Sequence, residues 1–143
     1  IAASWTDLIL VCNGSISAGT ANWLIQLGNG SIDTGTNYSE TGLWGTGSAA
    51  QSGRGTNQTS VNLNSYGYLD TVYAANVICH IFSYANTSTY KTFIQRANNA
   101  ANGTHVGVGL WRSTAAINTI KISTSASSFA ANTTLSLYGV KSA

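Results

Sequence analysis

The chain of 143 residues fits one domain and is poor in charge: 7% of its residues are charged and its formal net charge is +2, whereas about 25% of the residues of a typical soluble domain are charged. Because 43% of the residues are hydrophobic, including four Trp and seven Tyr, the composition excludes an intrinsically disordered chain. The six Lys and Arg residues form no basic stripe and no apolar run approaches the roughly 20 residues of a membrane helix, so we expect neither nucleic-acid binding nor membrane insertion.

Short runs of β-branched and aromatic residues, separated by Gly, Asn and Ser, predict an all-β chain with almost no helix. The predicted strands are, in chain order, Leu8–Cys12, Asn22–Leu27, Ser60–Leu63, Leu69–Tyr73, Asn76–Phe82, Tyr90–Gln95, His105–Trp111, Ile117–Ser123 and Thr134–Val140. Such a series of short strands predicts an antiparallel β-sandwich or barrel, formed as a single domain by residues 1–143. The chain begins with Ile1 instead of Met, which indicates processing or a piece of a longer protein.

Alternation of apolar and polar residues within several strands predicts sheets with one face in a core and one face exposed to solvent. The clearest apolar sets are Trp23, Ile25 and Leu27 in one strand, Val106, Val108 and Leu110 in another, with Gly107 and Gly109 opposite, and Leu135 and Leu137 in the last.

Two segments fit strands poorly. Gly42–Thr56 is rich in Gly and small polar residues and predicts a long loop, which is either a ligand- or partner-binding loop or a tolerated surface excursion. Ala97–Gly103 predicts a turn or a single short helical turn.

Catalytic and metal-binding patterns are nearly absent from the sequence. It has no P-loop, no nucleophile elbow and no His or Cys spacing typical of zinc. His80 and His105 are best interpreted as ordinary polar positions. Asp33 and Glu40 are the only acidic pair close in sequence, and nothing further selects them for glycoside hydrolysis. We therefore predict a non-enzymatic protein with no catalytic residues, no bound metal and no cofactor.

The two cysteines are too few for a disulfide framework. Cys12 and Cys79 each lie in an apolar run, which favours buried free thiols. A disulfide between them stays open as an alternative if the chain matures in an oxidising compartment.

Aromatic residues gather in the middle of the chain, several beside Gly or Asn. An exposed ring with neighbouring amides and hydroxyls offers a sugar an apolar face to stack on and polar groups to orient its hydroxyls. Packing in the core or between subunits is the commoner role of such rings, and it remains the alternative. The candidate ligand or partner contacts are Trp44, Tyr38, Tyr66 and Tyr68.

The C-terminal third carries the most specific pattern. Residues Trp111–Ile122 read WRSTAAINTIKI, and residues Phe129–Val140 read FAANTTLSLYGV. These two segments resemble the ending of many tailed-bacteriophage virion proteins, over about 30 of the 143 residues. One departure is Asn132, where that family usually has Gly; Asn tolerates the left-handed turn conformation, so the departure costs little.

The resemblance implies a jelly-roll-like structural protein exposed on the surface of the particle, in a capsid decoration, head fibre, tail fibre or baseplate. Its expected roles are assembly, stabilisation or host attachment. The expected partners are copies of the chain, as a homotrimer, other virion proteins, and a host-surface glycan. The protein would be assembled in the host cytoplasm and be extracellular in the particle. A carbohydrate-binding module or lectin-like domain outside a virion is the alternative.

Overall fold

The computed structural model describes residues 1, 3–66 and 68–142, and these form an antiparallel sandwich of two β-sheets. The strands of the larger sheet are β1 (Asp7–Gly14), β4 (Tyr38–Gly45), β5 (Ala50–Gln58), β7 (Ala75–Ile81), β8 (Lys91–Asn99), β9 (Gly103–Trp111) and β11 (Thr134–Val140). The strands of the smaller sheet are β2 (Trp23–Asn29), β3 (Ser31–Ile32), β6 (Val61–Asn62) and β10 (Thr119–Thr124). The predicted all-β antiparallel sandwich is confirmed. No helix among the described residues is long and apolar enough to cross a membrane.

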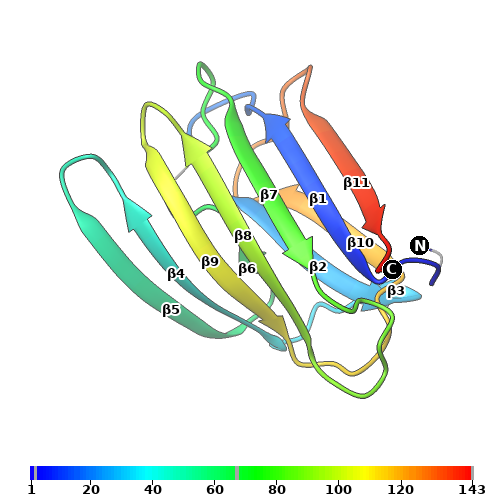
Figure 1. The fold of residues 1–143 in the computed structure, drawn as a ribbon. Coiled ribbons are helices and arrows are strands. Elements are labelled where there is room, and N and C mark those ends of the chain that lie inside the picture. The colour runs from blue at the N-terminus through cyan, green and yellow to red at the C-terminus, as the bar shows by residue number, and fades with distance from the viewer. Residues whose placement is uncertain (2, 67, 143) are drawn as a thin grey trace.

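The larger sheet has the strand order β11-β1-β7-β8-β9-β4-β5, and the smaller sheet packs behind part of it (Figure 1). In the smaller sheet β2 is central, pairing with β10, β3 and β6. The chain crosses between the sheets several times, for example from β1 to β2 and from β5 through β6 to β7. The strands β4 and β5 form one edge of the larger sheet and extend beyond the smaller one (Figure 1).

The hydrophobic core lies between the two sheets. Trp23, Ile25 and Leu27 of β2 are fully buried, as their alternation predicts. Cys12 and Cys79 project into the same core from the neighbouring strands β1 and β7, where both are buried free thiols. Burying a large apolar side chain stabilises the fold by about 1.5–3 kcal/mol, so the core accounts for much of the stability of the sandwich.

The predicted loop Gly42–Thr56 is instead most of a β-hairpin, and that prediction was wrong. Strands β4 and β5 pair along their length, and Gly47, with a φ of 86°, lies in the short turn between them. The glycines belong in the strands because neighbouring side chains lie over them: a Cβ atom on Gly53 would stand 2.7 Å from the ring of Trp44. Glycine here provides room for a neighbour instead of breaking the strand.

Two other boundaries also differ from the prediction. Leu69–Tyr73 is not a strand; Leu69 forms an isolated bridge with Ala21, and the Asp70 carboxylate accepts hydrogen bonds from the next residues of a turn. Strand β8 continues to Asn99, so the predicted turn Ala97–Gly103 is confined to the three residues before β9.

The valines of β9 face outward, although their alternation is also compatible with a core face. Val106 is 52% exposed and Val108 is 50% exposed, whereas His105 and Trp111 are buried. The inward positions between them are glycines, and a Cβ atom on Gly109 would collide with the ring of Phe93 in β8. Large side chains from the neighbouring strand fill this part of the interior, so the apolar set of β9 is on the opposite face.

Candidate functional site

A cleft of about 290 Å³ lies on the inner face of the larger sheet, on the β4–β5 side. Its volume is near the lower end of the roughly 300–1,000 Å³ found for ligand pockets, so it suits a small ligand. The lining comes from β4, β5, β8, β9 and the segment that follows β6. The side chains on which its chemistry depends are Glu40, Trp44, Gln58, Ser65, Gln95 and His105.

Three glycines in three neighbouring strands lie in one row, and two of them, Gly42 and Gly53, line the cleft. Gly42 of β4 pairs with Gly53 of β5 on one side and with Gly107 of β9 on the other. The same row reaches Gln95 of β8, which is directly opposite Gly107. Because directly paired residues share a face, this row of glycines makes room for the Trp44 ring over Gly53 and the His105 ring over Gly42.

Trp44 lines the cleft and begins a row of three aromatic rings. It stacks on Tyr66, with ring centroids 5.2 Å apart and an interplanar angle of 18°. Tyr66 in turn contacts Tyr68 at a centroid distance of 5.6 Å. The indole N–H of Trp44 donates a hydrogen bond of 2.8 Å to Gln51, which helps fix the ring. Three of the four aromatic residues singled out from the sequence therefore lie together beside one cleft.

Tyr38, the fourth, lies elsewhere and has a structural role. It is 0% exposed, and its hydroxyl accepts a hydrogen bond of 2.9 Å from the Leu27 N–H of the opposite sheet. The hydroxyl also lies 2.9 Å from the Asp33 carbonyl oxygen. Burial raises the pKa of Tyr38 to about 12. Tyr38 is thus a core residue that connects the two sheets and does not line the cleft.

His105 presents an unpartnered acceptor. Its Nδ1 lies 3.2 Å from the Leu63 carbonyl oxygen; since a carbonyl oxygen only accepts, Nδ1 carries the proton and the neutral ring has a bare Nε2. Burial lowers the pKa of His105, which favours this neutral form. The side chain is 3% exposed, and its Nε2 has no hydrogen-bond partner within residues 1, 3–66 and 68–142.

Gln95 presents a second acceptor. It is 2% exposed, its amide nitrogen lies 3.5 Å from the Asn62 carbonyl oxygen, and its Oε1 has no partner in the described part of the chain. A Cβ atom on Gly107 would stand 2.9 Å from Gln95 Nε2 and 3.0 Å from His105 Nε2, so the two side chains converge over this glycine. An unsatisfied buried polar atom costs about 1–3 kcal/mol; a ligand that donates hydrogen bonds here would remove that cost.

Glu40 contributes a partly buried carboxyl to the lining. Its Oε2 accepts a hydrogen bond of 2.5 Å from the Asn62 backbone N–H, and burial raises its pKa. Asp33, the acidic residue nearest to Glu40 in the sequence, is not part of this lining. It accepts hydrogen bonds from Trp111 at 2.8 Å and Asn37 at 2.9 Å. Although desolvation alone raises the pKa of Asp33, these bonds and one from a backbone N–H hold it below its usual value. The two acids are therefore not brought together across the cleft.

The described residues contain no group of three His, Cys, Asp or Glu side chains able to hold a metal ion. His80, on the outer face, pairs with Asp7 at 3.0 Å and is separate from the cleft.

The sequence prediction missed Gln95 and His105 as site residues. The alternation of β9 contained a usable signal, because it places His105 on the glycine side of the strand, opposite the valines. Comparisons of the chain with protein-family models, with curated proteins and with solved structures gave no match.

Proposed function

We propose that the chain is a non-enzymatic domain on the surface of a bacteriophage particle, and that its cleft binds a carbohydrate of the host surface. One observation carries the glycan part of the proposal: two buried acceptor atoms, His105 Nε2 and Gln95 Oε1, have no partner in the described chain and belong to side chains that line a cleft beside an aromatic ring.

The acceptor atoms of this lining favour a hydroxyl-rich ligand. A bare imidazole nitrogen and an amide oxygen both accept, so the complementary groups are hydroxyl donors. The Glu40 carboxyl adds a further acceptor to the lining. Trp44 supplies an apolar surface of the kind on which the C–H face of a sugar ring packs. A sugar ring combines these two requirements, apolar C–H groups and several hydroxyls, within a small volume.

The same lining supports binding without hydrolysis. Glycosidases of the common type place two carboxyl groups roughly 5–10 Å apart across the scissile bond. Glu40 is the one carboxylate among the described residues of the lining. His105 is oriented by a backbone carbonyl and not by a carboxylate, so it lacks the group that stabilises the charged ring in an acid–base triad.

The virion part of the proposal is supported by the sequence ending. Its two segments supply the strands β10 and β11, and Phe129, just before β11, packs on the core residue Trp23 with ring centroids 4.9 Å apart. We propose a homotrimer assembled with other virion proteins in the host cytoplasm and carried on the particle. Antibodies against the chain should label the surface of intact purified particles; absence of the chain from the particles would favour a carbohydrate-binding domain outside a virion.

The glycan proposal is tested by screening the purified chain on a glycan array and titrating the glycans that bind. We expect a small set of bound glycans, loss of their binding in Trp44→Ala, and unchanged binding in Tyr90→Ala. Tyr90 is a matched control because it is 54% exposed and does not line the cleft. An array without bound glycans, or a Trp44→Ala variant that binds like the wild type, would contradict the proposal.

A further inference from the structure

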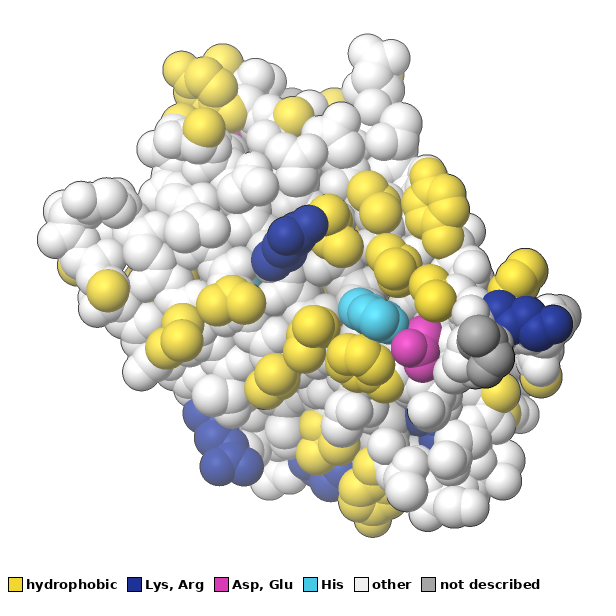
Figure 2. Space-filling model, viewed as in Figure 1, with side chains coloured by type: hydrophobic (Ala, Val, Ile, Leu, Met, Phe, Trp, Pro, Cys, Tyr) yellow, Lys and Arg dark blue, Asp and Glu magenta, His cyan; other side chains and the backbone are white. Residues whose placement is uncertain are grey.

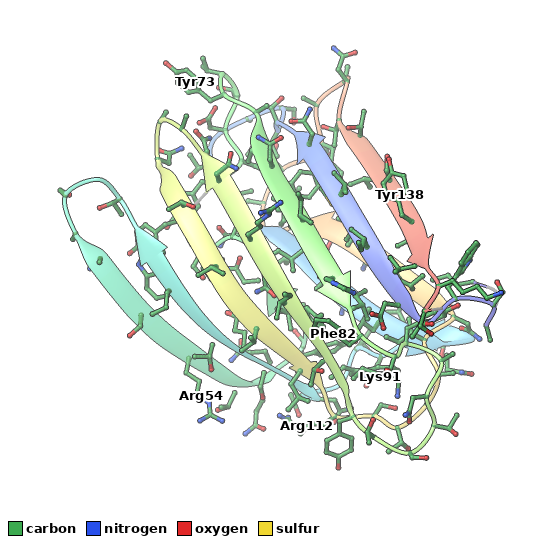
Figure 3. All side chains as sticks on the ribbon, in the orientation of Figure 1. Arg54, Tyr73, Phe82, Lys91, Arg112 and Tyr138 are labelled. Carbon is green, nitrogen blue, oxygen red and sulfur yellow. The ribbon has the colours of Figure 1, made fainter. Side chains whose placement is uncertain are left out.

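The outer face of the larger sheet carries two adjacent rows of mainly apolar side chains. Because directly paired residues share a face, the strand register places these side chains next to one another. One row consists of Tyr138, Ile9, His80, Ile94 and Val108, and the next of Val11, Ile78, Arg96, Val106 and Leu43. Figure 2 shows hydrophobic side chains gathered across this face, and Figure 3 shows Tyr138 on β11 at its far side.

These apolar side chains are open to solvent in the single chain. Leu43 is 59% exposed, Tyr138 is 56% exposed, and Ile94 is 47% exposed. Monomeric proteins rarely expose a contiguous apolar patch larger than a few hundred Å² unless it contacts a partner. We call the two rows together the outer patch.

A polar row borders the outer patch along one side. It consists of Thr134, Asn13, Asn76, Asn98 and Thr104, which are paired across the same strands. An apolar centre with a polar, hydrogen-bonding margin is the usual arrangement of a specific protein interface. On a sheet face that only contacts solvent, polar residues would occupy the central rows as well.

The dimensions of the face suit a stable contact. The outer patch crosses six strands, from β11 to β4. With about 4.8 Å between strands and about 3.3 Å per residue, the outer face of these strands measures roughly 25 Å in each direction. An area of that order is comparable with the roughly 800 Å² that each partner contributes to a standard interface.

Two charged residues belong to the outer patch or to its border. Arg96 lies within the patch and makes no hydrogen bond or ion pair with the residues that the structure describes. Asp7, at the border, accepts hydrogen bonds from His80 at 3.0 Å and from the Ser83 N–H at 2.7 Å. Asp7 is therefore already paired within the chain, and Arg96 is the charge of the outer patch that a partner surface would have to neutralise.

We propose that the outer patch docks a second copy of this chain. The inference identifies the contact surface for the self-assembly part of the proposed function, and it does not depend on the glycan. The cleft is on the inner face of the sheet, so association through the outer patch leaves it open. Assembly would then present several cleft copies at once and raise the avidity for a surface that displays many glycans.

The test is the molar mass of the purified chain by light scattering behind a sizing column. We expect a multiple of 14.9 kDa for the wild type and a single chain of 14.9 kDa for Ile94→Lys. Val72→Lys is the matched control and should remain associated, since Val72 is 76% exposed but lies outside the outer patch. A monomeric wild type over the accessible concentration range, or an Ile94→Lys variant that associates like the wild type, would overturn the proposal.

A second, milder variant guards against a failure of Ile94→Lys to fold. Val106→Thr keeps a β-branched side chain on an exposed strand position, so folding should be retained. We expect association to weaken about tenfold, as for a moderately important interface residue. Unchanged association of the folded Val106→Thr variant would count against the outer patch. Glycan binding to the single cleft, measured separately, should stay the same in every one of these variants.

Discussion

Gly42 in β4 lies against the ring of His105 in β9. A Cβ atom at position 42 would stand well inside the 3.0 Å that real Cβ atoms keep from His105 Nε2. The ring is held from its other side by the Leu63 carbonyl oxygen, at 3.2 Å from Nδ1. The position of the unpartnered Nε2 at the cleft therefore depends on the missing side chain of Gly42.

Replacing this glycine should close the cleft. In Gly42→Ala the new methyl group displaces the His105 ring, so we expect loss of glycan binding and a decrease of about 1–3 kcal/mol in the free energy of unfolding, as for other overpacked sites. Gly45→Ala in the same strand is the control, because the nearest atom to its new Cβ would be 3.9 Å away. Titration and chemical denaturation of both variants measure the effect. Binding in Gly42→Ala equal to that of Gly45→Ala would show that the ring position does not matter.

Ligand binding should depend on pH through His105. Protonation converts Nε2 from an acceptor into a donor, so affinity should fall as the pH falls through the pKa of the folded state. Burial holds that pKa below its usual value of 6.5, so binding should persist somewhat below pH 6.5. His105→Gln, which offers an acceptor that does not titrate, should remove this pH dependence. An affinity that varies with pH in the same way in the wild type and in His105→Gln would contradict the assignment.

The same pKa shift predicts a change in stability. Below pH 6.5 the unfolded chain takes up a proton on His105 while the folded chain does not. The free energy of unfolding should therefore decrease as the pH falls from about 6.5, and the decrease should end below the folded-state pKa. Thermal unfolding of the wild type and His105→Gln across this range isolates the contribution. A difference between them that does not vary with pH would contradict the shift.

Glu40 should change the pH dependence of the free energy of unfolding in the opposite direction. Its pKa is raised by burial, so the folded state prefers the protonated carboxyl, and stability is lost as the pH rises through the raised pKa. Glu40→Gln resembles the protonated form and keeps an oxygen that accepts from the Asn62 N–H. We expect this variant to unfold at a higher temperature than the wild type at neutral pH and at a similar temperature near pH 4. A Glu40→Gln variant that is less stable at neutral pH would show that the charge is needed.

The two cysteines should be unreactive in the folded chain. Both are buried as free thiols, and burial raises the pKa of Cys12 to about 12 and that of Cys79 further. The thiolate is the nucleophile, so a thiol reagent at pH 8 should modify neither residue until denaturant is added, and then both. Rapid modification of the folded protein would contradict the burial of the two thiols. Modification of fewer than two cysteines after unfolding without a reductant would contradict their being free.

The sandwich could be predicted from the sequence because the core strands have an apolar alternation that can be recognised within each strand. The alternation of Trp23, Ile25 and Leu27 identifies the buried face of β2 without knowledge of any partner strand. The β4–β5 hairpin was missed because glycine lowers strand propensity locally, while its use here, as space for Trp44, depends on a neighbouring strand.

The same limit applies to the cleft. Trp44 and Tyr66 could be singled out as rings beside small residues, although not as a stacked pair. The convergence of Gln95 and His105 over Gly107 requires the register of β8 against β9, which one sequence does not determine. Tyr38 shows the opposite limit. It was chosen as an aromatic residue beside Asn, but its position in the strand places it in the core.

The most direct test of the cleft assignment is a crystal structure of the chain with a glycan selected on the array. We predict a sugar ring against Trp44, with one hydroxyl within hydrogen-bond distance of His105 Nε2 and another at Gln95 Oε1. A glycan bound at any other surface, with these two acceptors still unpartnered, would contradict the proposed function.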